Sequence, residues 1–176
     1  NPGSSPRALN RISLPDSPIR LPDADVLFRR ALGDRAGGRA LGRLGEAARA
    51  FEDERFQDAR RILNQLVERT AEVPEVLELL GLVHYRMGHW RAGAKRLEAF
   101  RELTCSTEQH PVLADCYRAQ RRWDDVEVLW VELRDASPSA PLVTEGRLVA
   151  AGAIADQGRL AEAVSLLEKG WKIPSR

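Results

Sequence analysis

The residues of this chain best suited to bind a metal ion or to attack a substrate are two cysteines and three histidines. Cys105 and Cys116 lie eleven residues apart, without the C-x-x-C spacing of a zinc or redox motif. His84, His89 and His110 are too few and too irregularly spaced to form a zinc site by themselves. The sequence therefore predicts no metal site and no cofactor. It favours Cys116 as a small core residue of a protein in a reducing compartment.

Other catalytic patterns are missing from the sequence. There is no G-x-S-x-G motif, and the glycines lack the preceding strand and the G-K-[ST] ending of a phosphate-binding loop. Adjacent acids, at Asp53-Glu54 and Asp124-Asp125, fall at expected helix starts, where a negative charge interacts favourably with the helix dipole. We therefore expect a protein without enzymatic activity.

The composition is that of a soluble globular protein rather than a disordered chain. Hydrophobic residues make up 43% of the 176 residues and charged residues 30%. The net charge is +1, so no field of the whole chain directs it toward nucleic acid or a membrane. No apolar run approaches the roughly 18 residues that a membrane-spanning helix needs. We expect a cytoplasmic protein without membrane association.

The N-terminal segment, residues 1–22, is rich in proline and differs from the rest of the chain. It contains Pro2, Pro6, Pro15, Pro18 and Pro22 and is mildly basic. Proline has no amide donor and disfavours helix in the residue before it, so we expect this segment to be extended or disordered.

A short helix is predicted after this segment, capped by Asp25 and ended by Gly33. The glycine pair Gly37-Gly38 is then expected to break the chain before the regular part begins. Residues 1–36 are therefore predicted to be an N-terminal extension with one short helix.

From about residue 40 onward, apolar side chains recur at the spacing of helices that bury one face. Pro74 is suited to the first turn of a helix, where its missing amide costs nothing. Prolines and serines at 136–141 predict a loop, and the next apolar helical stretch begins at Leu148. Because alternating stretches typical of β-strands are nearly absent, we predict an all-α chain.

Two neighbouring helix pairs can be aligned along the sequence by a constant offset of 34 residues. Small residues of the second helices, such as Ala59 and Gly93, would let the paired helices approach closely. The aromatic residues Phe56, Trp90 and Trp123 would fill the space beside them as core residues. The pairs aligned by this offset are Ala47 and Gly81, Phe51 and Tyr85, Phe56 and Trp90, Ala59 and Gly93, Leu63 and Leu97, and Leu66 and Phe100.

These residues resemble the tetratricopeptide repeat family, whose repeat consists of two helices in about 34 residues, the same length as the offset. Leu77, Leu80 and Gly81 stand where the W-x-x-L-G motif of that family begins, and His84 stands in place of its tyrosine. The small residues of the second helices match the helix-crossing position of the family. The stretch from His110 to Gly152 also resembles tetratricopeptide proteins of actinobacteria, a resemblance from which no activity can be transferred.

The resemblance implies a right-handed superhelix of about four helix-turn-helix repeats. The repeat domain would cover residues 37–176, with repeats at about 40–73, 74–106, 107–140 and 141–174. In this family the first helix of each pair lines a concave surface, and that surface binds partner proteins. The side chains that the resemblance places in this groove include Leu44, Phe51, Glu52, Glu75, Glu78, Leu82, Tyr85, Arg86, Asp115, Arg118, Leu148 and Asp156.

The projected groove contains more acids than bases. With Glu108 and Glu145 added to the set, it contains seven acids and two arginines, a net charge of −5. An acidic and apolar groove suits a basic or amphipathic segment of an unidentified protein. The mildly basic residues 1–22 could occupy the groove themselves, as a self-contact. We therefore expect a non-enzymatic adaptor.

A second hypothesis concerns the second helices, whose arginines could contact RNA phosphates. Arg60, Arg61, Arg91 and Arg96 are among them. Acids interleave with these arginines at the i, i+4 spacing of an ordinary solvated helix face. The sequence therefore favours binding to a protein over binding to nucleic acid.

Overall fold

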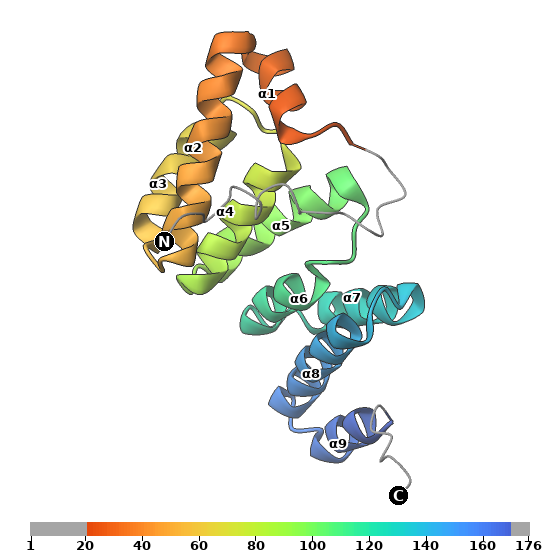
Figure 1. Ribbon diagram of the computed structural model, residues 1–176. Coiled ribbons are helices and arrows are strands. Elements are labelled where there is room, and N and C mark those ends of the chain that lie inside the picture. The colour runs from red at the N-terminus through yellow and green to blue at the C-terminus, as the bar shows by residue number, and fades with distance from the viewer. Residues whose placement is uncertain (1–20, 170–176) are drawn as a thin grey trace, which may run out of the picture. The chain divides into compact units, whose positions relative to one another are not determined.

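The computed structural model describes residues 21–169, and all regular structure in that range is helical (Figure 1), which confirms the all-α prediction. The chain divides into two compact units, Asn1–Ser106 and Thr107–Arg176. Across residues 21–169, no helix is both long and apolar enough to cross a bilayer. The helices are α1 (Ala24–Leu32), α2 (Asp34–Glu52), α3 (Phe56–Val67), α4 (Pro74–Arg86), α5 (Trp90–Thr104), α6 (His110–Ala119), α7 (Trp123–Ala136), α8 (Ala140–Asp156) and α9 (Leu160–Glu168).

The first unit contains α1 to α5, and each helix packs mainly against the next one along the chain. Its core is apolar and continuous from α1 to α5, with Phe28, Leu63, Leu80 and Phe100 almost completely buried. Burying one such side chain contributes about 1.5–3 kcal/mol. Pro74 begins α4 as predicted, because the first turn needs no amide donor there.

The glycine pair in the first unit does not break the chain, contrary to the prediction. Gly37 and Gly38 lie inside α2, which begins at Asp34. A Cβ atom on Gly37 would lie 2.7 Å from the backbone nitrogen of Arg29 in α1. Glycine is therefore required at position 37 because the backbones of α1 and α2 meet there.

The predicted cap of α1 is also wrong. This helix begins at Ala24 with Asp23 at the N-cap position, and no side chain caps it. The carboxylate of Asp25 instead accepts hydrogen bonds from Arg29 one turn later, at 2.9 and 3.0 Å.

The contact between α4 and α5 uses two residues that the constant offset identified. A Cβ atom on Gly81 would lie 2.6 Å from the side chain of Leu97, so these helices are as close as glycine allows. Trp90 differs from the prediction, because it is 37% exposed rather than part of the core. Its ring contacts Tyr85 edge-on, with the ring centroids 5.6 Å apart. Trp90 is the first residue of α5, and its indole is therefore partly exposed to solvent.

The second unit contains α6 to α9, and α8 is its central helix. It packs against α6, α7 and α9, and apolar residues therefore occur around its whole circumference. The loop predicted at 136–141 ends earlier than expected, because α8 begins at Ala140. The helical stretch predicted to begin at Leu148 is therefore the second half of a longer helix. The hydroxyl of Ser139 accepts a hydrogen bond from the amide of Leu142 at 3.4 Å, and Pro141 is tolerated in the first turn.

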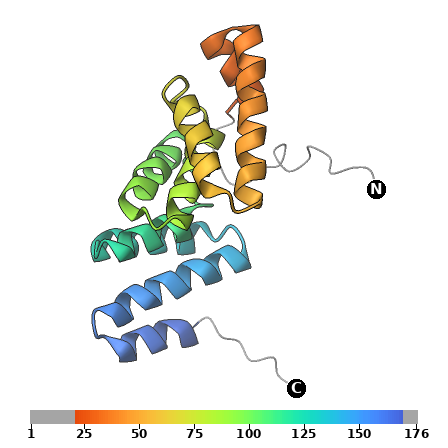
Figure 2. The ribbon, with the colours of Figure 1, turned by 90° about the vertical axis from the view of Figure 1, so that its left-hand side faces the viewer.

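The last helix, α9, lies beside α8 and is joined to it by a short turn (Figure 2). Ala163 is the one residue of α9 that is buried. Leu160 and Val164 are 65% and 53% exposed, and Leu167 one turn further is also exposed. This helix is therefore the most lightly packed of the second unit.

Candidate functional site

The residues predicted to line a groove in the first unit are placed in three different ways. Leu44 is 2% exposed and Glu78 5% exposed, so these two are core residues and not groove residues. The helix face that buries Ala40, Ala47 and Ala50 also contains Leu44, which explains the error in its position. The side chains of Leu82, Phe51 and Tyr85 are half-buried, whereas Glu52 and Arg86 are exposed.

Arg86 and Phe51, both predicted to line the groove, lie close to each other. The guanidinium of Arg86 lies 5.9 Å from the ring centroid of Phe51 and 4.8 Å from that of Phe56. It also forms an ion pair with Glu54 at 3.2 Å. Arg86 therefore links the turn between α2 and α3 to the end of α4.

Glu75 lies at the N-terminal end of α4, close to the start of α1. Burial raises the pKa of its carboxyl, and the negative charge of Asp23 adds to that effect. The amides of Glu75 and Ala24 oppose the shift by donating hydrogen bonds to the carboxylate. These contacts give Glu75 a structural role at two helix starts.

His84 is half-buried near the end of α4, and its ring lies against that of His89 with their Nδ1 atoms 3.4 Å apart. Burial lowers the pKa of His84 to about 4, with smaller effects from His89, Arg60 and Arg96. The ring is therefore neutral at neutral pH. Within residues 21–169, no three metal-binding side chains are grouped to hold an ion. Cys116 is buried, as predicted, and Cys105 is exposed.

In the second unit, three of the predicted groove residues form one ionic cluster. Arg118 of α6 donates to the carboxylate of Asp156 of α8, with Nε–Oδ2 at 2.6 Å and Nη2–Oδ1 at 3.3 Å. Asp115 lies 3.6 Å from the same guanidinium. The hydrogen bonds from Arg118 lower the pKa of Asp156. Leu148 is 56% exposed on the same helix as Asp156.

This cluster alters the electrostatics predicted for the groove. Asp115 and Asp156 share the single guanidinium of Arg118, and Glu78 is buried. Fewer acids are therefore directed toward a partner than the sequence count of seven suggested.

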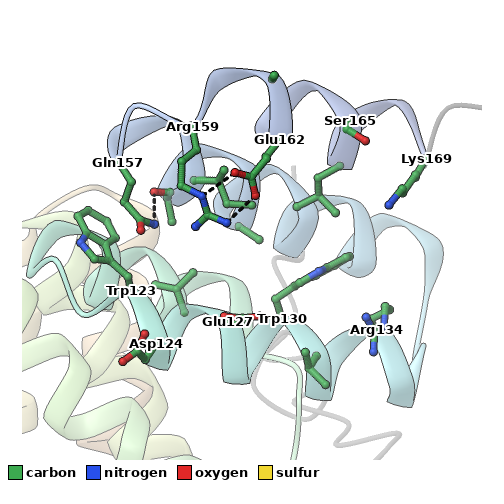
Figure 3. Close-up of a pocket in the computed structure, with 17 residues that line it drawn as sticks. Trp123, Asp124, Glu127, Trp130, Arg134, Gln157, Arg159, Glu162, Ser165 and Lys169 are labelled. Carbon is green, nitrogen blue, oxygen red and sulfur yellow. Dashed lines mark hydrogen bonds and ion pairs between the residues drawn. The ribbon is translucent and has the colours of Figure 1, made fainter.

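A different site in the second unit was not predicted: a groove between α7 and α9, with α8 as its floor (Figure 3). We call it the α7–α9 groove, and its volume is about 560 Å³. Its walls and floor are formed by Trp123, Asp124, Val126, Glu127, Trp130, Val131, Arg134, Ala150, Ala153, Ile154, Gln157, Arg159, Ala161, Glu162, Ser165, Leu166 and Lys169.

The α7–α9 groove has an apolar centre and a charged rim. Trp130 lies in its wall, with the guanidinium of Arg147 5.6 Å from the ring centroid of the indole. Small residues of α8, Ala150 and Ala153, form part of the floor. At the start of α9, on the rim, Arg159 donates a hydrogen bond to Glu162 at 2.9 Å and holds the pKa of that carboxyl below its usual value.

Sequence reasoning missed this groove because its three helices contribute residues that are far apart in the chain. The one local signal was the pair Trp123 and Trp130, which lie seven residues apart and therefore on the same face of α7.

A hollow of about 690 Å³ lies between α2 and α3 in the first unit. Five of its eleven lining residues are charged, and none is aromatic; the charged ones are Arg39, Arg43, Glu46, Glu68 and Arg69. A hollow of that composition resembles ordinary solvated surface more than a binding site.

No protein-family model matches the chain, and a comparison with curated proteins finds no significant match.

Proposed function

We propose that this chain is a non-enzymatic adaptor that binds a segment of another protein, and that the α7–α9 groove is its principal binding surface. The observation that carries the proposal is the composition of that groove, which has an apolar centre that includes Trp130, a second tryptophan, Trp123, at the start of α7, and a charged rim. Protein interfaces combine a buried aromatic and aliphatic centre with a polar rim in the same way.

The first helices of the proposed repeats supply a second surface for the same adaptor role. Phe51, Leu82 and Tyr85 are half-buried there, and Glu52 is exposed beside them. A basic or amphipathic segment would suit this surface of the first unit. The proposed self-contact involves residues 1–22, of which residues 1–20 lie outside the part of the chain that the structure describes.

The alternative role, RNA binding through arginines of the second helices, gains no support from specific contacts. Arg61, one of these arginines, pairs with Asp58 at 3.5 Å. Such i, i+3 pairs are typical of a solvated helix surface. We therefore propose a protein partner.

Site-specific photo-crosslinking in the cells that produce the protein tests the adaptor proposal. A photoreactive phenylalanine at Ser165, an exposed residue of the groove, should crosslink a defined partner protein. The same group at Val128, which is exposed on α7 outside the groove, is the matched control and should not. Identical crosslinking patterns at the two positions would contradict the assignment of the groove as a binding surface.

A further inference from the structure

The two walls of the α7–α9 groove run in the same direction, so that the helix starts adjoin at one end and the helix ends at the other (Figure 3). Asp124 and Glu127 of α7 and Glu162 of α9 lie toward the helix starts. Arg134 of α7 and Lys169, which directly follows α9, lie toward the helix ends. The groove is therefore electrically polar along its length.

Neighbouring charges reduce this polarity without reversing it. Arg159 lies among the three acids and leaves that end with a net charge of −2. Asp135 contacts Arg134 at 2.8 Å, so that Arg134, Asp135 and Lys169 together carry a net charge of +1. The Arg134–Asp135 pair is exposed, so the guanidinium stays available to a partner at little cost.

The apolar centre of the groove lies between the two charged ends. Val126 and Trp130 from α7, Ile154 from α8 and Leu166 from α9 line it. From Asp124 to Arg134 the wall extends for ten residues, about 15 Å of helix. A partner helix of about three turns would cover that length and could place apolar side chains at i, i+3, i+4 and i+7 into the centre.

We infer that the α7–α9 groove binds an amphipathic α-helix of a partner protein, antiparallel to α7 and α9. The partner helix carries acids in its first turn and bases in its last. Its acids then face Arg134 and Lys169, and its bases face Asp124, Glu127 and Glu162. This inference rests on the proposed adaptor function and adds the chemistry and direction of the partner.

Helix dipoles favour the same direction. The C-terminal ends of α7 and α9 carry partial negative charge, and the N-terminal end of a partner helix carries partial positive charge. An antiparallel arrangement therefore brings opposite partial charges together at both ends. Acids in the first turn and bases in the last also stabilise the partner helix itself.

Two synthetic helices test the inference. Both are lactam-bridged amphipathic peptides of fourteen residues with the same apolar stripe and the same composition. One carries acids at its start and bases at its end, and the other carries the reverse order. The lactam bridges keep their helicity equal, which circular dichroism verifies, so that helix stability does not decide the result. Affinity for the intact chain is measured by fluorescence anisotropy at low salt.

The peptide with acids at its start should bind at least tenfold more tightly than the reversed peptide. Added salt should reduce this difference, because the rim charges are exposed and screened. The double variant Arg134→Glu, Lys169→Glu should abolish or reverse the preference. Its matched control, Arg91→Glu with Lys95→Glu, changes two exposed cations of the first unit and should leave the preference intact.

The variant Ser165→Trp fills the groove from an exposed position and should abolish the binding of both peptides. Equal affinity for the two peptides, lost in Ser165→Trp, would overturn the direction and charge pattern inferred here and leave the adaptor proposal standing. That result would mean that the charges at the ends of α7 and α9 only stabilise these two helices, by interacting with their dipoles. Binding that Ser165→Trp does not change would overturn the inference, since the peptides would then bind elsewhere. Absence of binding by either peptide would also overturn it, and the adaptor proposal would still be decided by crosslinking at Ser165.

Discussion

The guanidinium of Arg118 reaches from α6 to the carboxylate of Asp156 near the end of α8 and holds it through two hydrogen bonds, at 2.6 and 3.3 Å. The guanidinium passes over Gly152, where a Cβ atom would lie 2.6 Å from one of its nitrogens. The sequence predicted both charged residues as groove residues. Their contact makes them a clamp between two helices of the second unit.

Replacing Asp156 by asparagine should lower the free energy of unfolding by about 0.5–1 kcal/mol, a value reduced for the exposure of the pair. A double-mutant cycle with Arg118→Met should give a coupling energy of the same size. The folded-state pKa of Asp156 is lowered, so the contribution is present above the ordinary aspartate pKa and is lost as the pH falls through the folded-state value. Urea titrations at pH 7 and pH 3 measure it. Equal loss at both pH values would contradict the assignment.

The glycine pair of α2 offers a matched comparison. Gly37→Ala should destabilise the chain by about 1–3 kcal/mol, because the new methyl group would collide with the backbone of Arg29. Gly38→Ala meets only the end of the Arg29 side chain, at 3.8 Å, and should stabilise the helix by about 0.5–1 kcal/mol. Thermal unfolding monitored by circular dichroism compares them. Similar effects of the two substitutions would disprove the close contact of α1 and α2.

His84 should make the protein sensitive to acid. The folded-state pKa of about 4 lies below the ordinary value of 6.5, so the unfolded chain binds the proton more tightly between these values. Stability should fall by roughly 1–2 kcal/mol as the pH decreases from 6.5 to 4, after allowance for partial exposure. The variant His84→Gln should lose this dependence. Denaturant titrations at pH 7 and pH 4.5 test the difference, and an unchanged pH dependence in the variant would rule out His84 as its source.

Arg86 should stabilise the first unit through its contacts with Phe56 and Glu54. Arg86→Met keeps the aliphatic stem and should cost about 0.5–1 kcal/mol. Arg91→Met, at an exposed position of α5, is the control and should change stability by less than about 0.5 kcal/mol. Chemical denaturation of both variants provides the comparison. Equal stability of the two variants would show that the Arg86 contacts contribute nothing.

The helix pairs could be predicted from the sequence because their signals are local. The constant offset that aligns Ala47 with Gly81, and the fit of Gly81 against Leu97, depend on neighbouring helices alone. Gly37 was misread for a related reason. Glycine serves both as a helix breaker and as a site of close helix contact, and only the position of Arg29 distinguishes the two roles.

The candidate site could be predicted much less well. Leu44 and Glu78 were predicted to lie on a surface, but both are buried. The spacing of apolar residues shows that one face of a helix is buried, but it does not fix which residues lie at the edge of that face. The α7–α9 groove depends on three helices that meet in space, and no local pattern contains Trp130, Ile154 and Leu166 together.

The light packing of α9 has a consequence for how the groove would work. Ala163 is the one residue of this helix that is buried, so opening α9 away from α8 would expose little apolar surface. We therefore expect α9 to open more readily than α7 or α8. Amide hydrogen exchange should be faster in α9 than in α8, and a bound helix should slow it. The groove would then adjust its width to its partner, and affinity would depend on how well a partner orders this last helix.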